Sequence, residues 1–228
     1  MRSTEHGDNL ICLTRLWAFN CYLLREDDGL TLIDTGLPRS ADQILAAAAA
    51  AGAPIRRIVL THGHQDHVGS LDALVEQLAE VEVLAGDREA RLIAGDRRLD
   101  DDEPANKLRG RYPTLQTEPT RTLADGDRVG SLEVVATPGH TPGHVAFLDT
   151  RDRTLIAGDA LQTAGGIAVA GVVRPMFPLM AMGTWSKGLA KSSAVRLRML
   201  EPTRLAVGHG AVLEQPLEAM EEAIGQAD

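Results

Sequence analysis

The segment THGHQDHVG at positions 61–69 constrains this chain more than any other feature of its sequence. It places four potential metal ligands, His62, His64, Asp66 and His67, in one loop directly after the strand-like run at 56–60. Alternate residues of a tight loop can turn their side chains to the same side, so His62 and His64 can share one metal ion. Asp66 and His67 project from the following turn, where a second ion can bind. Imidazole and carboxylate suit zinc, iron or manganese, so the segment predicts a metal site without naming the metal.

Further polar residues lie at the ends of the strand-like runs LEVVATPG, TLIAGD and RLAVGHG. They include His140, Asp159 and His209, and His144 begins the run HVAFLD. Two neighbouring divalent ions repel each other, so a bridging anion is expected, and Asp159 is the best carboxylate for that role. The pattern TPGH occurs twice, at 137–140 and 141–144, and chemistry alone does not decide which of its histidines is a ligand. His6 lies in an N-terminus expected to be frayed and is interpreted as an ordinary surface histidine.

The order of the expected elements predicts an α/β fold. Helical spacing and alanine content predict helices at 38–51, 70–78 and 185–200, with Gly52 ending the first, and a last helix from 214 onward. Two apolar runs between 11 and 34, separated by a turn at 26–29, predict a hairpin. Residues 95–120 are polar and proline-containing, which indicates a long connection that borders the site. A length of 228 residues with 44% hydrophobic content predicts one domain, 1–228.

These motifs resemble those of the metallo-β-lactamase superfamily, whose HxHxDH motif is matched by HGHQDH. Four others occur in the family's order: IDTG with Asp34, TPGH with His140, GD with Asp159, and GHG with His209. The resemblance covers about residues 10–212 and implies a four-layer αββα sandwich. It implies that His62, His64 and His140 bind one metal, that Asp66, His67 and His209 bind a second, and that Asp159 bridges the two. Asp34 and His144 would support these ligands from behind. Two divalent ions per chain are expected, zinc first, with iron or manganese as alternatives.

The chemistry expected of such a centre is hydrolysis. A bound metal lowers the pKa of water to about 7 and polarises a carbonyl or phosphoryl oxygen, so a metal-bound hydroxide is the expected nucleophile. Asp66 is the candidate catalytic residue that orients this hydroxide and relays a proton. The sequence contains no GxSxG elbow, and Cys12 and Cys21 are interpreted as buried thiols, so covalent serine or cysteine catalysis has little support.

Departures from individual branches of the superfamily narrow the expected substrate. Asp159 differs from true zinc β-lactamases, which lack that residue, and His64 differs from the flavodiiron branch, which carries Glu there. The long basic C-terminal helical region of glyoxalase II is not found. A small-molecule ester, thioester or lactone is therefore expected. The alternatives are a mononuclear iron oxidoreductase, a phosphodiesterase or nuclease, and a non-catalytic metal-binding module.

The net charge bears on whether the chain binds nucleic acid, and the search for signal and membrane-spanning segments bears on its place in the cell. The net charge of −9 gives no electrostatic footprint for nucleic acid. Neither a secretion signal nor a membrane span is recognisable, so a cytoplasmic protein is expected. Residues 165–185 mix glycine with apolar side chains, among them Phe177 and Trp185. We interpret them as the wall of an apolar substrate pocket or, equally, as core cover or a homodimer contact.

Overall fold

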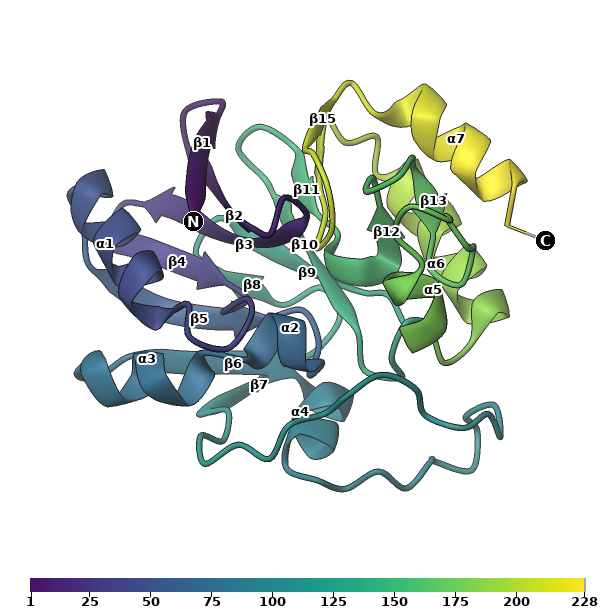
Figure 1. Cartoon of the computed structure of the whole chain (residues 1–228), viewed down its shortest axis with the longest axis horizontal. Coiled ribbons are helices and arrows are strands. Elements are labelled where there is room, and N and C mark those ends of the chain that lie inside the picture. Colours follow the sequence, from purple (N-terminus) through teal and green to yellow (C-terminus); the bar gives the residue numbers. More distant parts are fainter. Residues whose placement is uncertain (228) are drawn as a thin grey trace.

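The computed structural model describes residues 1–227 and contains two β-sheets that lie face to face (Figure 1). In the first sheet, the N-terminal strands pair antiparallel up to β4, and β4 to β7 run parallel. Its strands, in spatial as well as sequence order, are β1 (Arg2–His6), β2 (Leu10–Arg15), β3 (Phe19–Glu26), β4 (Gly29–Ile33), β5 (Ile55–Leu60), β6 (Glu82–Gly86) and β7 (Arg121–Leu123).

The second sheet is antiparallel except for one parallel pair, β11 with β14. In spatial order its strands are β15 (Leu213–Glu214), β14 (Arg204–Ala206), β11 (Thr154–Ile156), β10 (Val145–Asp149), β9 (Leu132–Ala136) and β8 (Arg128–Val129). A separate two-stranded ribbon is formed by β12 (Leu161–Gln162) and β13 (Ala168–Val169).

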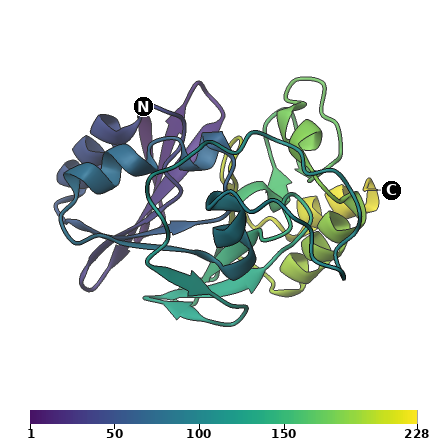
Figure 2. The ribbon, with the colours of Figure 1, turned by 90° about the horizontal axis from the view of Figure 1, so that it is seen from below.

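Helices cover the outer face of each sheet, so central strands such as β4 and β10 are buried on both sides. Along β3, Cys21 and Leu23 face one apolar cluster while Tyr22 and Leu24 face another, as the two-residue period of a strand requires. The first cluster lies against α1 (Ala41–Ala51) and α3 (Leu71–Gln77), and the second fills the space between the sheets. A third cluster lies between the second sheet and the helices α6 (Lys187–Met199) and α7 (Leu217–Gly225). Figure 2 shows the two helical layers on opposite sides, which confirms the expected αββα sandwich.

Most predicted elements form close to their expected limits. The hairpin of β3 and β4 turns at 26–29, and α1 ends before Gly52, which adopts a left-handed conformation. Helix α1 begins three residues later than predicted. Residues 94–120 form no helix or strand, which agrees with the long connection predicted for 95–120.

Two terminal expectations were wrong. The N-terminus is not frayed, because residues 2–6 pair in register with β2. This edge strand is largely exposed, so its sequence carries no apolar run. The last helix begins at Leu217 rather than at 214, because residues 213–214 instead pair with β14. Within residues 1–227, no helix is long and apolar enough to cross a membrane.

Candidate metal centre

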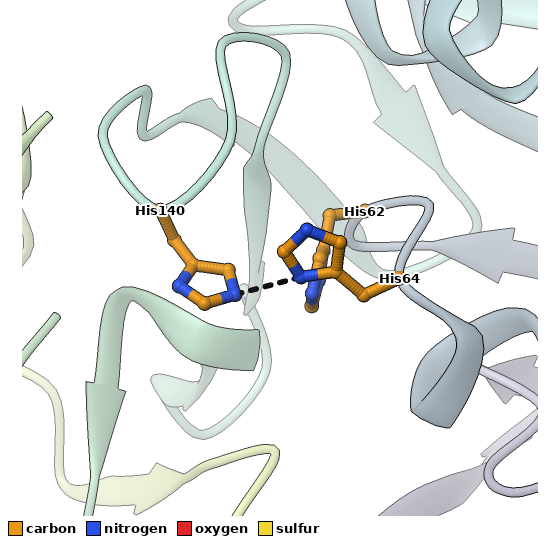
Figure 3. Close-up of side chains that lie close together, drawn as sticks. All are labelled: His62, His64 and His140. Atoms are coloured by element: carbon orange, nitrogen blue, oxygen red, sulfur yellow. Dashed lines mark hydrogen bonds between the residues drawn. The ribbon is translucent and has the colours of Figure 1, made fainter. Parts of the chain in front are cut away.

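The seven predicted ligands converge at one edge of the two sheets. Their ligand atoms form three overlapping groups, and within each group these atoms all lie within 4.8 Å of one another. The groups are His62, His64 and His140; His62, His67 and Asp159; and Asp66, His67 and His209. Figure 3 shows the first group, in which His64 and His140 point toward each other across the gap between their loops.

Topology brings these loops together. The loop after β5 carries His62 and His64, and the short helix α2 (Gln65–Val68) then turns His67 back toward them. The same β5 loop is tied to the second sheet, because the Thr61 carbonyl accepts a 3.0 Å hydrogen bond from the Val145 amide. From the second sheet, β11 leads into the short 3₁₀ turn η1 (Gly158–Ala160) and β14 leads into the loop with His209.

Asp159 lies at the centre of the arrangement and contacts histidines from the segments that follow β5, β9 and β14. Its Oδ1 is 3.4 Å from His67 Nε2, and its Oδ2 is 3.4 Å from His140 Nε2 and 3.1 Å from His209 Nε2. Asp66 contacts the same nitrogen of His209, with Oδ2 3.4 Å from Nε2. Asp66 is also the most exposed of the seven, with 28% of its side chain accessible.

Burial and neighbouring charge divide the histidines into two kinds. Burial, reinforced by neighbouring imidazoles, holds the pKa of His62 and His140 well below the usual range. Burial acts the same way on His209, but the charge and hydrogen bond of Asp159 overcome it and raise its pKa to about 9. The pKa of His67 is raised for the same reason. Burial alone would raise the pKa of Asp66, yet its contacts with His209 and His67 lower it.

This donor set fits divalent metal ions. His62 Nε2, His67 Nε2 and Asp159 Oδ1 are buried without a hydrogen-bond partner among the described residues, a costly state for a polar atom unless something else satisfies it. Divalent ions would supply positive charge beside the carboxylates of Asp66 and Asp159, and imidazole and carboxylate are ligands that these ions prefer.

Asp34 and His144, which were expected to support the ligands, each bond to one member of the three groups. Asp34 Oδ2 is 2.8 Å from His67 Nδ1 and 2.7 Å from Thr61 Oγ1, and its Oδ1 accepts a 2.8 Å bond from the Thr61 amide. His144 Nε2 accepts a 3.0 Å bond from the backbone amide of Asp159. That bond occupies Nε2 of His144. His144 is absent from the three groups, whereas His140 belongs to one.

Comparison with known proteins identifies the family. A model of the metallo-beta-lactamase superfamily matches residues 15–209. The chain belongs to the metallo-beta-lactamase superfamily. Bacillus subtilis YobT, itself uncharacterized, is 46% identical over 100% of this chain and 99% of its own length. A hydroxyacylglutathione hydrolase of Rhodospirillum rubrum is 33% identical over 70% of this chain and 50% of its own length. The crystal structure of TTHA1623 in a di-iron-bound form has a TM-score of 0.68 and 29% identity, covering 90% of this chain and 94% of that one.

One buried carboxylate at the edge of the candidate metal centre was not predicted from the sequence. Glu89 is fully buried in α4 (Asp87–Ile93), where its side chain bonds to the loops carrying His62, His64 and His140. It belongs to no motif. The available signal was its position three and four residues before Leu92 and Ile93, on the apolar face of the helix.

Phe177 and Trp185 lie beside the centre rather than in the cavity at its mouth. The apolar side chains of that cavity, which measures about 180 Å³, are Leu179 and Met180. Phe177 is buried, with its ring 4.8 Å from that of His209. Trp185 is buried as well, and its indole N–H donates a hydrogen bond to the Asn106 carbonyl. Trp185 and Asn106 together line a separate cleft. Their role in binding substrate stays a prediction.

Proposed function

We propose that this chain is a dinuclear metal-dependent hydrolase of a small-molecule ester, thioester or lactone. The observation that carries the proposal is Asp159, whose carboxylate contacts His67, His140 and His209 and thereby joins the two expected ligand sets. A carboxylate shared in this way suits a pair of divalent ions, with zinc the first candidate and iron or manganese the alternatives. The di-iron form of the related TTHA1623 supports a count of two.

The ions would supply an acidified water and a Lewis acid for the substrate's carbonyl oxygen. In this proposal, the roles of the chain's own residues follow from their positions. Asp66 is the most exposed of the candidate ligands, and its Oδ2 lies 3.4 Å from His209 Nε2 at the accessible side of the centre, so its carboxylate can orient the attacking water and relay its proton. Asp34 accepts from His67 at Nδ1, which leaves His67 Nε2 free of a proton for the metal.

The proposed substrate class rests on the size of the cavity and on a relative. A cavity of about 180 Å³ admits a small acyl group, and Leu179 and Met180 give it an apolar side. The hydrolase from Rhodospirillum rubrum acts, by its name, on a hydroxyacyl thioester of glutathione, which supports carbonyl chemistry. We therefore propose a small-molecule substrate rather than nucleic acid.

The test combines metal analysis with substrate screening. Protein reconstituted separately with zinc, iron and manganese is analysed for bound metal and assayed on matched ester, thioester, lactone and phosphodiester substrates. Two metals per chain and oxygen-independent hydrolysis of a carbonyl substrate are expected, with turnover reduced at least about 100-fold in Asp66→Ala. One iron per chain with oxygen consumption, phosphodiester cleavage alone, or full turnover by Asp66→Ala would overturn the proposal.

A further inference from the structure

Glu89 is a fully buried acidic side chain that no motif explains. It extends from α4 between two loops that belong to different sheets. One loop follows β5 and carries His62 and His64, and the other joins β9 to β10 and carries His140. These are the three histidines drawn in Figure 3.

Its two carboxylate oxygens are divided between these loops. Oε1 accepts a 2.7 Å hydrogen bond from the amide of Gly63, the residue between His62 and His64. Oε2 accepts a 2.6 Å bond from the hydroxyl of Thr141, the residue after His140. The Gly143 amide hydrogen-bonds to the same carboxylate. Glu89 therefore spans the gap that the three histidines must close around one ion.

The packing around these bonds leaves the loops little freedom. A Cβ added to Gly143 would lie 2.2 Å from the Glu89 backbone nitrogen, and one added to Gly86 would lie 2.9 Å from the Gly143 carbonyl oxygen. The loop of His140 thus rests directly on the first turn of α4. On the other side, a Cβ at Gly63 would meet Ile93 at 2.9 Å.

We propose that Glu89 is a positioning residue that holds the loops of His62, His64 and His140 at the separation one metal ion requires. It is the counterpart of Asp34, which supports His67 in the other ligand set. The inference rests on the dinuclear centre of the proposed function. Supporting partners of this kind change metal affinity by about 10- to 100-fold when they are removed.

The experiment measures the two metal affinities separately, by titrating metal-free protein with zinc against a chromophoric chelator. Glu89→Ala is expected to weaken one of the two sites about 10- to 100-fold and to leave the other within about threefold. Glu89→Gln can still accept from the Gly63 amide and donate to the Thr141 hydroxyl, and loses at most the bond from the Gly143 amide, so it should recover most of the affinity lost in Glu89→Ala. Glu76→Ala, at an exposed glutamate of α3, is the control and should bind both ions normally.

A double variant assigns the effect to one ligand set. In a His140→Ala background, the site that Glu89 supports is already lost, so adding Glu89→Ala should not change the remaining affinity. Should Glu89→Ala fail to fold, shown by a lost thermal transition of the metal-free protein, Thr141→Val removes one of the same bonds and carries the test.

The inference is overturned if Glu89→Ala, or Thr141→Val in its place, binds both ions as wild type does. It is overturned equally if both sites weaken together, or if glutamine does not restore binding. Wild-type protein that binds fewer than two ions would instead reject the dinuclear centre itself.

Discussion

Replacing Asp34 by asparagine tests how the ligands are held in the correct protonation state. The carboxylate of Asp34 accepts from the Thr61 amide, the Thr61 hydroxyl and His67 Nδ1. In Asp34→Asn the oxygen is needed by the Thr61 amide, so the new NH₂ group faces His67 Nδ1 as a donor. The proton of His67 must then move to Nε2, the atom 3.4 Å from Asp159 Oδ1. A protonated Nε2 cannot bind metal.

The expected loss is about 10- to 100-fold in affinity at one metal site, or about 1.4 to 2.7 kcal/mol. It is measured by chelator competition on the metal-free protein, with thermal unfolding to show that the fold persists. Asp149→Asn is the matched control, because Asp149, the last residue of β10, is also buried but pairs with Arg151 in the following turn, away from the ligands. It should lower stability and leave both metal affinities unchanged. Affinities of Asp34→Asn within about twofold of wild type at both sites would refute the reasoning.

Three further predictions concern packing, pH and the contact between the sheets. Gly208→Ala places a Cβ 2.1 Å from Asp159 Oδ1, so metal affinity should fall about tenfold or more, and wild-type binding in the same chelator titration would contradict this. Burial raises the pKa of Glu89 to about 7, although its bonds to Thr141 and Gly63 act in the opposite direction. The stability that protonated Glu89 contributes is therefore fully present below pH 4.5 and is lost as pH rises through about 7. Relative to Glu89→Gln, metal-free wild type should lose about 3 kcal/mol of unfolding free energy over that range, and a pH-independent difference would count against it. The Tyr22 hydroxyl donates a 2.6 Å bond to the Val207 carbonyl, so Tyr22→Phe should cost about 1 kcal/mol in urea unfolding, and an unchanged midpoint would show that the bond adds nothing.

The candidate ligand residues could be found from sequence because each lies shortly after the end of a strand, in a loop or in the short elements α2 and η1. Parallel strand order and glycine-rich turns fix where such a loop emerges, so HGHQDH and GHG specify position as well as chemistry. His140 and His144 show the limit of this reasoning, since both occur in the same TPGH pattern. They are distinguished by a bond to the Asp159 amide, which depends on where η1 lies in three dimensions.

Features that depend on tertiary packing were harder to predict from the sequence. Glu89 becomes significant only because α4 packs against loops from both sheets, and no local pattern records that contact. The strand β1 was missed because an edge strand needs backbone pairing and not an apolar face. Phe177 and Trp185 were recognised as apolar residues near the site. The burial of Trp185 involves Asn106 of the 94–120 segment, which has no periodicity, and Phe177 packs against Phe19 and Ala164, which are distant in sequence.

The central claim is that two metal ions share Asp159 between two sets of histidines. Anomalous diffraction from crystals grown with the reconstituting metal tests it most directly, because it locates each ion independently of activity. Two peaks are expected, one among His62, His64 and His140 and one among Asp66, His67 and His209, with the Asp159 carboxylate between them. A single peak, or two peaks of which neither contacts Asp159, would contradict the account.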